Sequence, residues 1–360
     1  MAAGARRLAL AALAALAGVL GARMTRVTPR HVLAAHALVD AHTDLPLGLR
    51  EKLGGVPTRF HVNQSGSTHL DAPRLRKGMA AAVVAAAYVE CGENSGEDAL
   101  AQLRLIREVA DVDNDVTVVA TSAREVRLAH ATRRTALILG VEGLHAFEDG
   151  SGVPLAHALR AAYRLGARVV TLNHNCHTAV SDSCCDPAGS DDAGLRKRDT
   201  IHLLNDMGMV VDLSHASPRT ARDVLLTSRA PVIVSHSGSY ELCAHPRNFP
   251  SDLLPLLRDN GGLVMVPFHI PFVCSDNVEG VVDHIEFFVR SIGARHVGIG
   301  SDFDGIPKGV HPLSGADAYP ALVAALLRRL PASDVALIIG SNFLRVMEEA
   351  ASQQRVGSLA

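Results

Sequence analysis

Short, strongly apolar runs recur along this chain, and they constrain its fold more than any other feature. Most of them are separated by segments with helical periodicity. Nearly continuous apolar runs are typical of parallel strands buried on both faces, and strands that alternate with helices form α/β folds. The predicted strands are Leu38–Ala41, Ala80–Tyr88, Ala136–Val141, Val169–Asn173, Met209–Ser214, Val232–Ser235, Leu263–Phe268 and Val297–Ser301.

Amphipathic helices are predicted between these strands, and a terminal helix is predicted to pack on them. Eight strands with interleaved helices indicate a (β/α)8 barrel of the metallo-dependent hydrolase type, forming one catalytic domain over residues 31–350 with a short tail over 351–360. A doubly wound sheet is the alternative, but no glycine-rich phosphate motif follows the first strand. The predicted helices are Glu97–Ala110, Leu155–Leu165, Leu195–Met207, Pro218–Thr227, Ser251–Asp259, Val281–Ile292 and Ala316–Leu330, with the terminal segment at Val335–Glu349.

The composition points to a small-molecule partner. Of the 360 residues, 48% are apolar and 20% charged, and the net charge is −2, so nothing favours disorder or attraction to nucleic acid. Tryptophan is absent and aromatic residues make up only 4%, which disfavours binding of single-stranded nucleic acid by stacking.

The first residues resemble a secretory signal peptide. Arg6 and Arg7 precede the apolar stretch Leu8–Leu20, and no acidic residue occurs in the first 30 positions. We expect residues 1–22 to be removed and the protein to be secreted or extracellular; a mitochondrial transit peptide is the rival interpretation. The C-terminus has no apolar tail that would signal a lipid anchor, although membrane association is an alternative.

Metal-binding residue types fall at or just beyond the ends of six predicted strands. In (β/α)8 barrels the carboxyl ends of the strands meet at one face, where the chemistry takes place. Polar side chains at these ends are therefore candidates for one shared site. They are His42, Asp44, Glu142, His174, His215, His236 and Asp302.

These residue types can bind two cations together. His42 and Asp44 lie on the same side of an extended segment, because side chains alternate along a strand. His42, Asp44 and Glu142 supply the ligands of one cation, while Glu142, His215 and His236 supply those of a second. Nitrogen and oxygen ligands suit Zn²⁺ best, with Mn²⁺ or Co²⁺ possible, and they leave positions open for a shared water or hydroxide.

An ordered series of motifs is similar to that of the membrane (renal) dipeptidase family of zinc metallopeptidases. It spans essentially the whole chain after the signal peptide, which makes it far more specific than any single motif. The resemblance implies a (β/α)8 barrel with a binuclear zinc site. The segments are VDAHTDLP, GVEGLH, TLNHNCHT, VVDLSHAS, PVIVSHS, HPRN, VGIGSDFDG and GSNFLRVMEE.

Site roles follow from this resemblance residue by residue. It implies two Zn²⁺ per chain: His42 and Asp44 bind the first, His215 and His236 the second, and Glu142 bridges them. His174 matches the histidine that contacts substrate and stabilises the tetrahedral intermediate. Arg247 matches the residue that pairs with the terminal carboxylate of the substrate. Asp302 matches the proton-handling aspartate, and Asp304 is expected to be a structural turn residue.

The resemblance also bears on the six cysteines. It places Cys91 with Cys176, and Cys243 with Cys274, where vertebrate members of the family have disulfides. Cys184 and Cys185 have no assigned counterpart, so their state is open. Family members are often homodimers, and the resemblance allows membrane association.

Departures from the family pattern concern the pocket wall rather than the metal ligands. Thr43 stands where asparagine is common, Leu47 replaces a tryptophan, and Leu144 and the region of Val180 also differ. The sequence therefore predicts that the protein hydrolyses its substrate, but it does not predict which dipeptides are preferred. Among the other histidines, His269 is the one expected to line the pocket.

We therefore predict a zinc-dependent dipeptidase in which a metal-bridging hydroxide attacks the peptide bond of a dipeptide. His174 supports the carbonyl oxygen, Asp302 moves the proton to the leaving amine, and Arg247 holds the carboxylate. Two alternatives are a metal-dependent amidohydrolase acting on a lactam or another non-peptide amide, and a relative that binds without catalysis. Nucleobase deaminases favour H-x-H on the first strand, whereas this chain has H-x-D.

Overall fold

The computed structural model describes residues 27–62, 66–93, 95–186, 188, 193–355 and 357–358. The predicted signal peptide, residues 1–22, lies outside the described residues. Among the described helices, none combines the length and apolar character needed to cross a bilayer.

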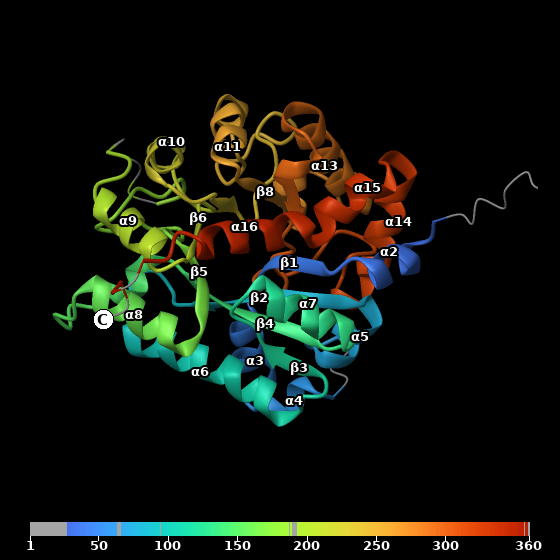
Figure 1. Ribbon diagram of the computed structural model, residues 1–360, viewed down its shortest axis with the longest axis horizontal. Coiled ribbons are helices and arrows are strands. Elements are labelled where there is room, and N and C mark those ends of the chain that lie inside the picture. The colour runs from blue at the N-terminus through green and yellow to red at the C-terminus, as the bar shows by residue number, and fades with distance from the viewer. Residues whose placement is uncertain are drawn as a thin grey trace, which may run out of the picture.

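Eight parallel strands form the centre of the molecule, with helices around them (Figure 1). Each predicted run overlaps one of these strands, and together they form a barrel, so the predicted fold is confirmed and the doubly wound alternative is wrong. In the order in which they pair, the strands are β1 (Leu38–Thr43), β2 (Ala80–Tyr88), β4 (Thr135–Glu142), β5 (Ala167–Thr171), β6 (Val210–Asp212), β7 (Ile233–Val234), β8 (Leu263–Val266) and β9 (Val297–Ile299).

The first and last strands meet at their carboxyl ends. The amide of Asp302 donates to the carbonyl of His42 over 3.0 Å, and the amide of Asp44 donates to the carbonyl of Phe303 over 2.8 Å. The buried carboxylate of Asp40 in β1 also accepts from the Ser301 amide over 2.8 Å. These bonds close the barrel beside two of the predicted site residues.

The predicted helices are present, with shifted ends. The helix predicted from Leu195 begins at Arg198, because Leu195 pairs with Ser181 in a β-bridge, and the helix predicted from Val281 begins earlier, at Val278. The helix predicted from Ser251 begins as a 3₁₀ turn over Ser251–Leu253. The helices are α6 (Gly96–Val112), α8 (Leu155–Leu165), α9 (Arg198–Asp206), α10 (Pro218–Thr227), α11 (Leu254–Asn260), α13 (Val278–Ile292) and α14 (Tyr319–Arg329).

Several short elements were not predicted. The strand β3 (Thr117–Val119) pairs with β4 off the barrel path and leads into α7 (Ala123–Ala131). A strand of three residues such as β3 is too short for a periodic pattern. The other short helices are α2 (Pro29–Ala35), α3 (Leu45–Leu53), α4 (Pro57–Phe60), α5 (Ala72–Gly78), α12 (Ile270–Val273) and α15 (Ala332–Ala336).

The terminal helix α16 (Asn342–Ala351) closes the amino end of the barrel, and it lies across the strands in Figure 1. Its Phe343 and Met347 pack with residues inside the barrel, such as Val39 and Ile138. Near its C-terminus, Ala351 lies against Gly208, just before β6. With the amino end filled in this way, the carboxyl ends of the strands are left to form a cavity.

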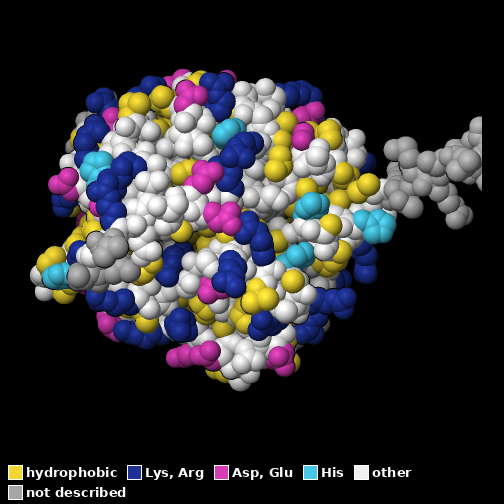
Figure 2. All heavy atoms as spheres, viewed as in Figure 1, with side chains coloured by type: hydrophobic (Ala, Val, Ile, Leu, Met, Phe, Trp, Pro, Cys, Tyr) yellow, Lys and Arg dark blue, Asp and Glu magenta, His cyan; other side chains and the backbone are white. Residues whose placement is uncertain are grey.

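Charged side chains of both signs are interspersed over the face shown in Figure 2. This distribution accords with the net charge of −2. It differs from the single-sign surface typical of proteins that bind nucleic acid by charge.

Candidate metal centre

The five predicted metal ligands converge at the carboxyl end of the barrel. Each lies at or within three residues of the end of its strand, and each is only 1–6% exposed. His42 is in β1, Asp44 precedes α3, Glu142 ends β4, His215 follows β6, and His236 follows β7.

The Glu142 carboxylate lies between two groups of ligand atoms. Its Oε2 is 3.6 Å from His42 Nε2, and its Oε1 is 3.2 Å from His215 Nε2 and 3.6 Å from His236 Nε2. Asp44 Oδ2 is also 3.6 Å from His42 Nε2. The structure therefore forms the two triplets that chemistry selected, with Glu142 in both.

The ligand set fits two divalent cations. The buried Nε2 of His42 has no hydrogen-bond partner among the described residues, and its two nearest carboxylate oxygens are too distant for a hydrogen bond. Buried polar atoms are rarely left unpaired, and an ion is one of the accepted explanations. Nε2 of His215 and Nε2 of His236 face each other over 3.1 Å, an arrangement that a shared cation satisfies.

Hydrogen bonds behind the histidines orient their rings. His215 Nδ1 donates to Asn175 Oδ1 over 3.0 Å, and His236 Nδ1 donates to Ser235 Oγ over 2.8 Å, since that hydroxyl itself donates to Asp212. We assign these tautomers from the hydrogen-bond network. In both rings the Nε2 lone pair then points toward Glu142, as in metal sites where an outer group fixes the ligand.

Asp212 is the most important residue near the metal centre that the sequence analysis missed. Its Oδ1 accepts from the amides of Ser214 and Ser235, and its Oδ2 accepts from the hydroxyls of Thr171 and Ser235. A ligand atom of Asp212 also lies near His42 and His236, but both oxygens are engaged in holding β5, β6 and β7. A carboxylate inside an otherwise apolar run was the available signal.

Burial and mutual interaction shift the pKa values of the ligands. Burial lowers the pKa values of His215 and His236 well below 6.5, so both rings are neutral and ready to bind a cation. Burial opposes ionisation of Glu142, but His42 and the neighbouring rings outweigh it and lower the pKa of Glu142 well below 4.5.

The pKa values of both His42 and Asp44 are raised. Burial works against the charge on His42, but Glu142 and Asp44 prevail and raise the pKa of His42 well above 6.5. Burial raises the pKa of Asp44 to about 7. In the absence of a cation, a proton on His42 therefore balances the carboxylates around it.

Two site residues adopt a backbone conformation that side chains disfavour. The φ angles are 67° at His215 and 65° at Asp302, in the left-handed region. Such residues cost about 1–3 kcal/mol each and are found where a side chain must be aimed. Both lie just beyond a strand, where the turn directs the side chain into the site.

His174 follows β5 and stands beside the metal ligands. Its ring centroid is 4.5 Å from that of His215 and 4.7 Å from that of Tyr88. Cys91 Sγ is 3.7 Å from His174 Nδ1. Burial lowers the pKa of His174, which keeps its ring neutral at neutral pH.

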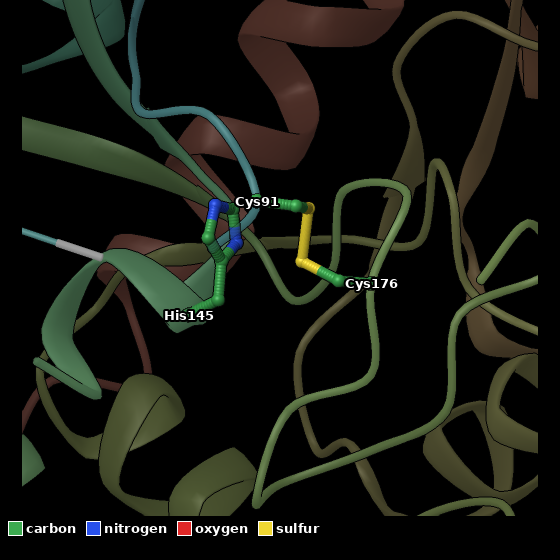
Figure 3. A group of neighbouring side chains, drawn as sticks. All are labelled: Cys91, His145 and Cys176. Carbon is green, nitrogen blue, oxygen red and sulfur yellow. A yellow bond between two sulfur atoms is a disulfide. The ribbon is translucent and has the colours of Figure 1, made fainter. Parts of the chain in front are cut away.

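A disulfide adjoins this histidine. Cys91 and Cys176 are bonded, and the His145 ring lies next to them (Figure 3). The bond ties the segment after β2 to the loop after β5, which contains His174. Cys243 and Cys274 are also bonded, so both pairs implied by the resemblance are confirmed. Cys184 and Cys185, which the sequence left open, form a third disulfide.

Arg247 and Asp302 complete the predicted substrate-binding set. Arg247 is only 6% exposed, and it donates to the carbonyl of His236 over 3.2 Å and to Ser237 Oγ over 3.4 Å. Its Nε is buried with no partner among the described residues, so the guanidinium retains a donor for a substrate carboxylate. Burial raises the pKa of Asp302 to about 6.

Asp304 serves structure, as expected. Its carboxylate accepts from the amide of His69 over 2.8 Å and from Lys52 Nζ over 3.1 Å. These contacts hold the turn after β9 against the chain after β1.

A cavity of about 670 Å³ opens above the metal ligands. It includes the predicted His174, Arg247, Asp302 and His269. The five metal ligands form the floor of this cavity: Asp44, Glu142 and His215 line it directly, whereas His42 and His236 do not. Several lining residues were not predicted, because neither their residue type nor their place in the sequence showed that they face the cavity. These are Glu51, Tyr88, Glu90, Asn175, Cys185, His245 and Phe272.

Comparison with known proteins agrees with this architecture. The family model described as Membrane dipeptidase (Peptidase family M19) matches residues 27–358. Dipeptidase aclJ of Aspergillus oryzae is 36% identical over 88% of this chain and 78% of its own length. Dipeptidase verJ of Clonostachys rogersoniana is 34% identical over 88% of this chain and 85% of its own length.

Solved structures share the fold. The dipeptidase AC, a metallopeptidase of family M19, has a TM-score of 0.78 and 25% identity. The match covers 88% of this chain and 98% of the dipeptidase AC chain. A metallopeptidase from Rhodobacter sphaeroides, liganded with a phosphinate mimic of the dipeptide L-Ala-D-Ala, has a TM-score of 0.78 and 24% identity. That match covers 88% of this chain and 99% of the other.

Proposed function

Because this chain belongs to the membrane dipeptidase family and is a metal-dependent dipeptidase, we propose that two Zn²⁺ ions complete its active site. His42 and Asp44 would hold one ion, His215 and His236 the other, and Glu142 both. One observation carries this proposal: Glu142 turns Oε2 toward His42, at 3.6 Å, and Oε1 toward His215, at 3.2 Å.

When bound, the ions would activate a water molecule as the nucleophile and polarise the carbonyl of the scissile peptide bond. The rest of the chemistry belongs to the side chains of this chain. Arg247 binds the terminal carboxylate of the dipeptide, because its buried guanidinium has an unpaired donor at the cavity wall. This contact orients the scissile bond and excludes longer peptides, whose carboxylate lies further from that bond.

His174 and Asp302 act on the reacting atoms. His174 is neutral and lines the cavity beside the metal ligands, so its ring can donate a hydrogen bond to the oxygen that becomes charged. Asp302 takes the proton of the attacking water and gives it to the leaving amine. A carboxyl with a pKa of about 6 can hold and release a proton near neutral pH.

Elemental analysis combined with a dipeptide assay tests the proposal. Purified protein is expected to contain two zinc ions per chain, to lose activity on chelation, and to regain it when zinc is restored. One ion per chain in fully active protein would overturn the two-metal site. Activity that survives complete removal of metal would overturn the metal-dependent mechanism.

We further propose that residues 1–22 direct export and that the protein is secreted. The three disulfides support this proposal, because such bonds are rare in reducing compartments. Expression in a secreting host with N-terminal sequencing of the product tests it. Retention of the uncleaved chain in membranes would favour membrane association instead.

The resemblance supports a homodimer as the working assembly. Light scattering of the purified protein measures its mass directly. A monomeric mass would contradict the proposed dimer without affecting the catalytic proposal.

A further inference from the structure

The cavity is cationic on one side and anionic on the other. Arg247 follows β7, whereas Glu90 follows β2, and both line the cavity. In the order of the eight strands, β2 and β7 are four places apart, which puts them on opposite sides of the barrel. Glu51 lies on α3, next to the β2 side. A dipeptide anchored at Arg247 therefore extends its first residue toward Glu51 and Glu90.

These two carboxylates are available to a ligand. Both are exposed, and neither forms an ion pair with a lysine or arginine within the described ranges. The cations on either side of Glu51 are engaged elsewhere: Arg50 binds Asp98 at 2.9 Å and Lys52 binds Asp304 at 3.1 Å. Apart from Arg247, no lysine or arginine lines the described cavity.

Glu90 is also held in place. The Tyr88 hydroxyl donates to Glu90 Oε2 over 2.5 Å, and the Tyr88 ring packs against His174 with centroids 4.7 Å apart. The next residue, Cys91, is anchored by its disulfide to Cys176 (Figure 3). A carboxylate fixed before binding loses less entropy when it pairs with a cation.

We propose that Glu51 and Glu90 make this enzyme prefer dipeptides whose first residue has a cationic side chain. This inference rests on the proposed function, in particular on Arg247 as the carboxylate anchor. The α-amino group is common to all dipeptides and cannot discriminate among them. The flexible four-carbon stem of lysine can carry an ammonium group from the reacting centre to the rim.

Three substrates that differ only in the first side chain measure this preference. Lys-Ala and norleucine-Ala share the same stem and differ by the ammonium group, and Glu-Ala reverses the charge. We expect kcat/KM to be roughly three- to tenfold higher for Lys-Ala than for norleucine-Ala, as is usual for partly solvated ion pairs. Glu-Ala is expected to be the slowest, and the preference should weaken as salt is raised.

A charge-neutralising double variant locates the effect. Glu51→Gln with Glu90→Gln retains an acceptor for the Tyr88 hydroxyl but removes both charges, so the ratio between Lys-Ala and norleucine-Ala should fall to about one. Glu93→Gln is the matched control, because Glu93 is an exposed acid in the same segment that does not line the cavity. This control should keep the wild-type ratio.

Equal rates for the two substrates in the wild type, or an unchanged ratio in the double variant, would overturn the inference. Failure of the proposed function looks different: the zinc-loaded protein would cleave none of the three dipeptides. Calorimetric binding of phosphinate analogues of Lys-Ala and norleucine-Ala gives a readout independent of turnover. The lysine analogue should bind roughly three- to tenfold more tightly, and equal Kd values would also overturn the inference.

Discussion

The floor of the active-site cavity and its rim are built differently. The five ligands of the floor are 1–6% exposed, and two of them, His215 and His236, are fixed by hydrogen bonds from behind. At the rim, Glu51 and Glu90 are exposed, and Glu90 accepts a hydrogen bond from the Tyr88 hydroxyl. A buried network tolerates little change because each group depends on its neighbours, whereas exposed rim residues can vary without loss of the fold. We therefore expect reactivity to reside in the floor and selectivity in the rim.

The largest effect should come from the residue shared by both cation sites. Glu142→Gln removes the charge that faces His42, His215 and His236, so we expect loss of bound zinc and a fall in kcat on the order of a thousandfold or more. Metal analysis and a dipeptide assay measure both. Retention of two ions and of activity would show that the floor is less interdependent than proposed.

Arg247→Ala is expected to have the next largest effect on activity. Loss of the carboxylate anchor should raise KM strongly and lower kcat/KM on the order of a hundredfold, because a buried charged hydrogen bond is lost. A dipeptide amide, which has no carboxylate, should be a poor substrate of the wild type and lose little more in the variant. An equal loss for dipeptide and amide would contradict the assigned contact.

The hydrogen bonds behind the ligands should matter less than the ligands themselves. Asp212→Asn replaces one acceptor oxygen by a donor and disturbs the Ser235 hydroxyl that orients His236. We expect zinc affinity to fall roughly ten- to a hundredfold. Competition with a chelator of known affinity measures this change, and unaltered affinity would mean that His236 is held by packing alone.

The pH dependence should reveal Asp302. Burial raises its pKa to about 6, so the ionised base is depleted as pH falls below that value. We expect kcat/KM to be about tenfold lower one pH unit below this midpoint. Bound cations favour the ionised form and can only move the midpoint to lower pH. The residual activity of Asp302→Asn should not show this fall in kcat/KM at acidic pH. If the fall persists in the variant, it is caused by a group other than Asp302.

Rim substitutions should have the smallest effect on the protein itself. Glu51→Gln is expected to change the free energy of unfolding by less than ~0.5 kcal/mol and to leave zinc content unchanged, because the side chain is exposed and has no ion-pair partner among the described residues. Denaturant unfolding and metal analysis check this. Loss of zinc in this variant would erase the distinction between floor and rim.

Most of the barrel was predictable from local patterns. The strands are buried on both faces, so each is a nearly continuous apolar run, and the ligands directly follow those runs. The strand β3 and the helices α4 and α12 were missed, because three or four residues do not form a recognisable period. The role of Asp212 was also missed, since its four donors come from three different strands or strand ends.

The sequence by itself determined the barrel, the identity of the ligand side chains and their order, because those features depend on residue type and on spacing along one strand. Only the tertiary structure decided that Glu142 turns one oxygen to each histidine group, and that Glu90 lies across the cavity from Arg247. The physical reason is the closure of the barrel. It brings together residues far apart in the chain, and no local pattern records the distances between them.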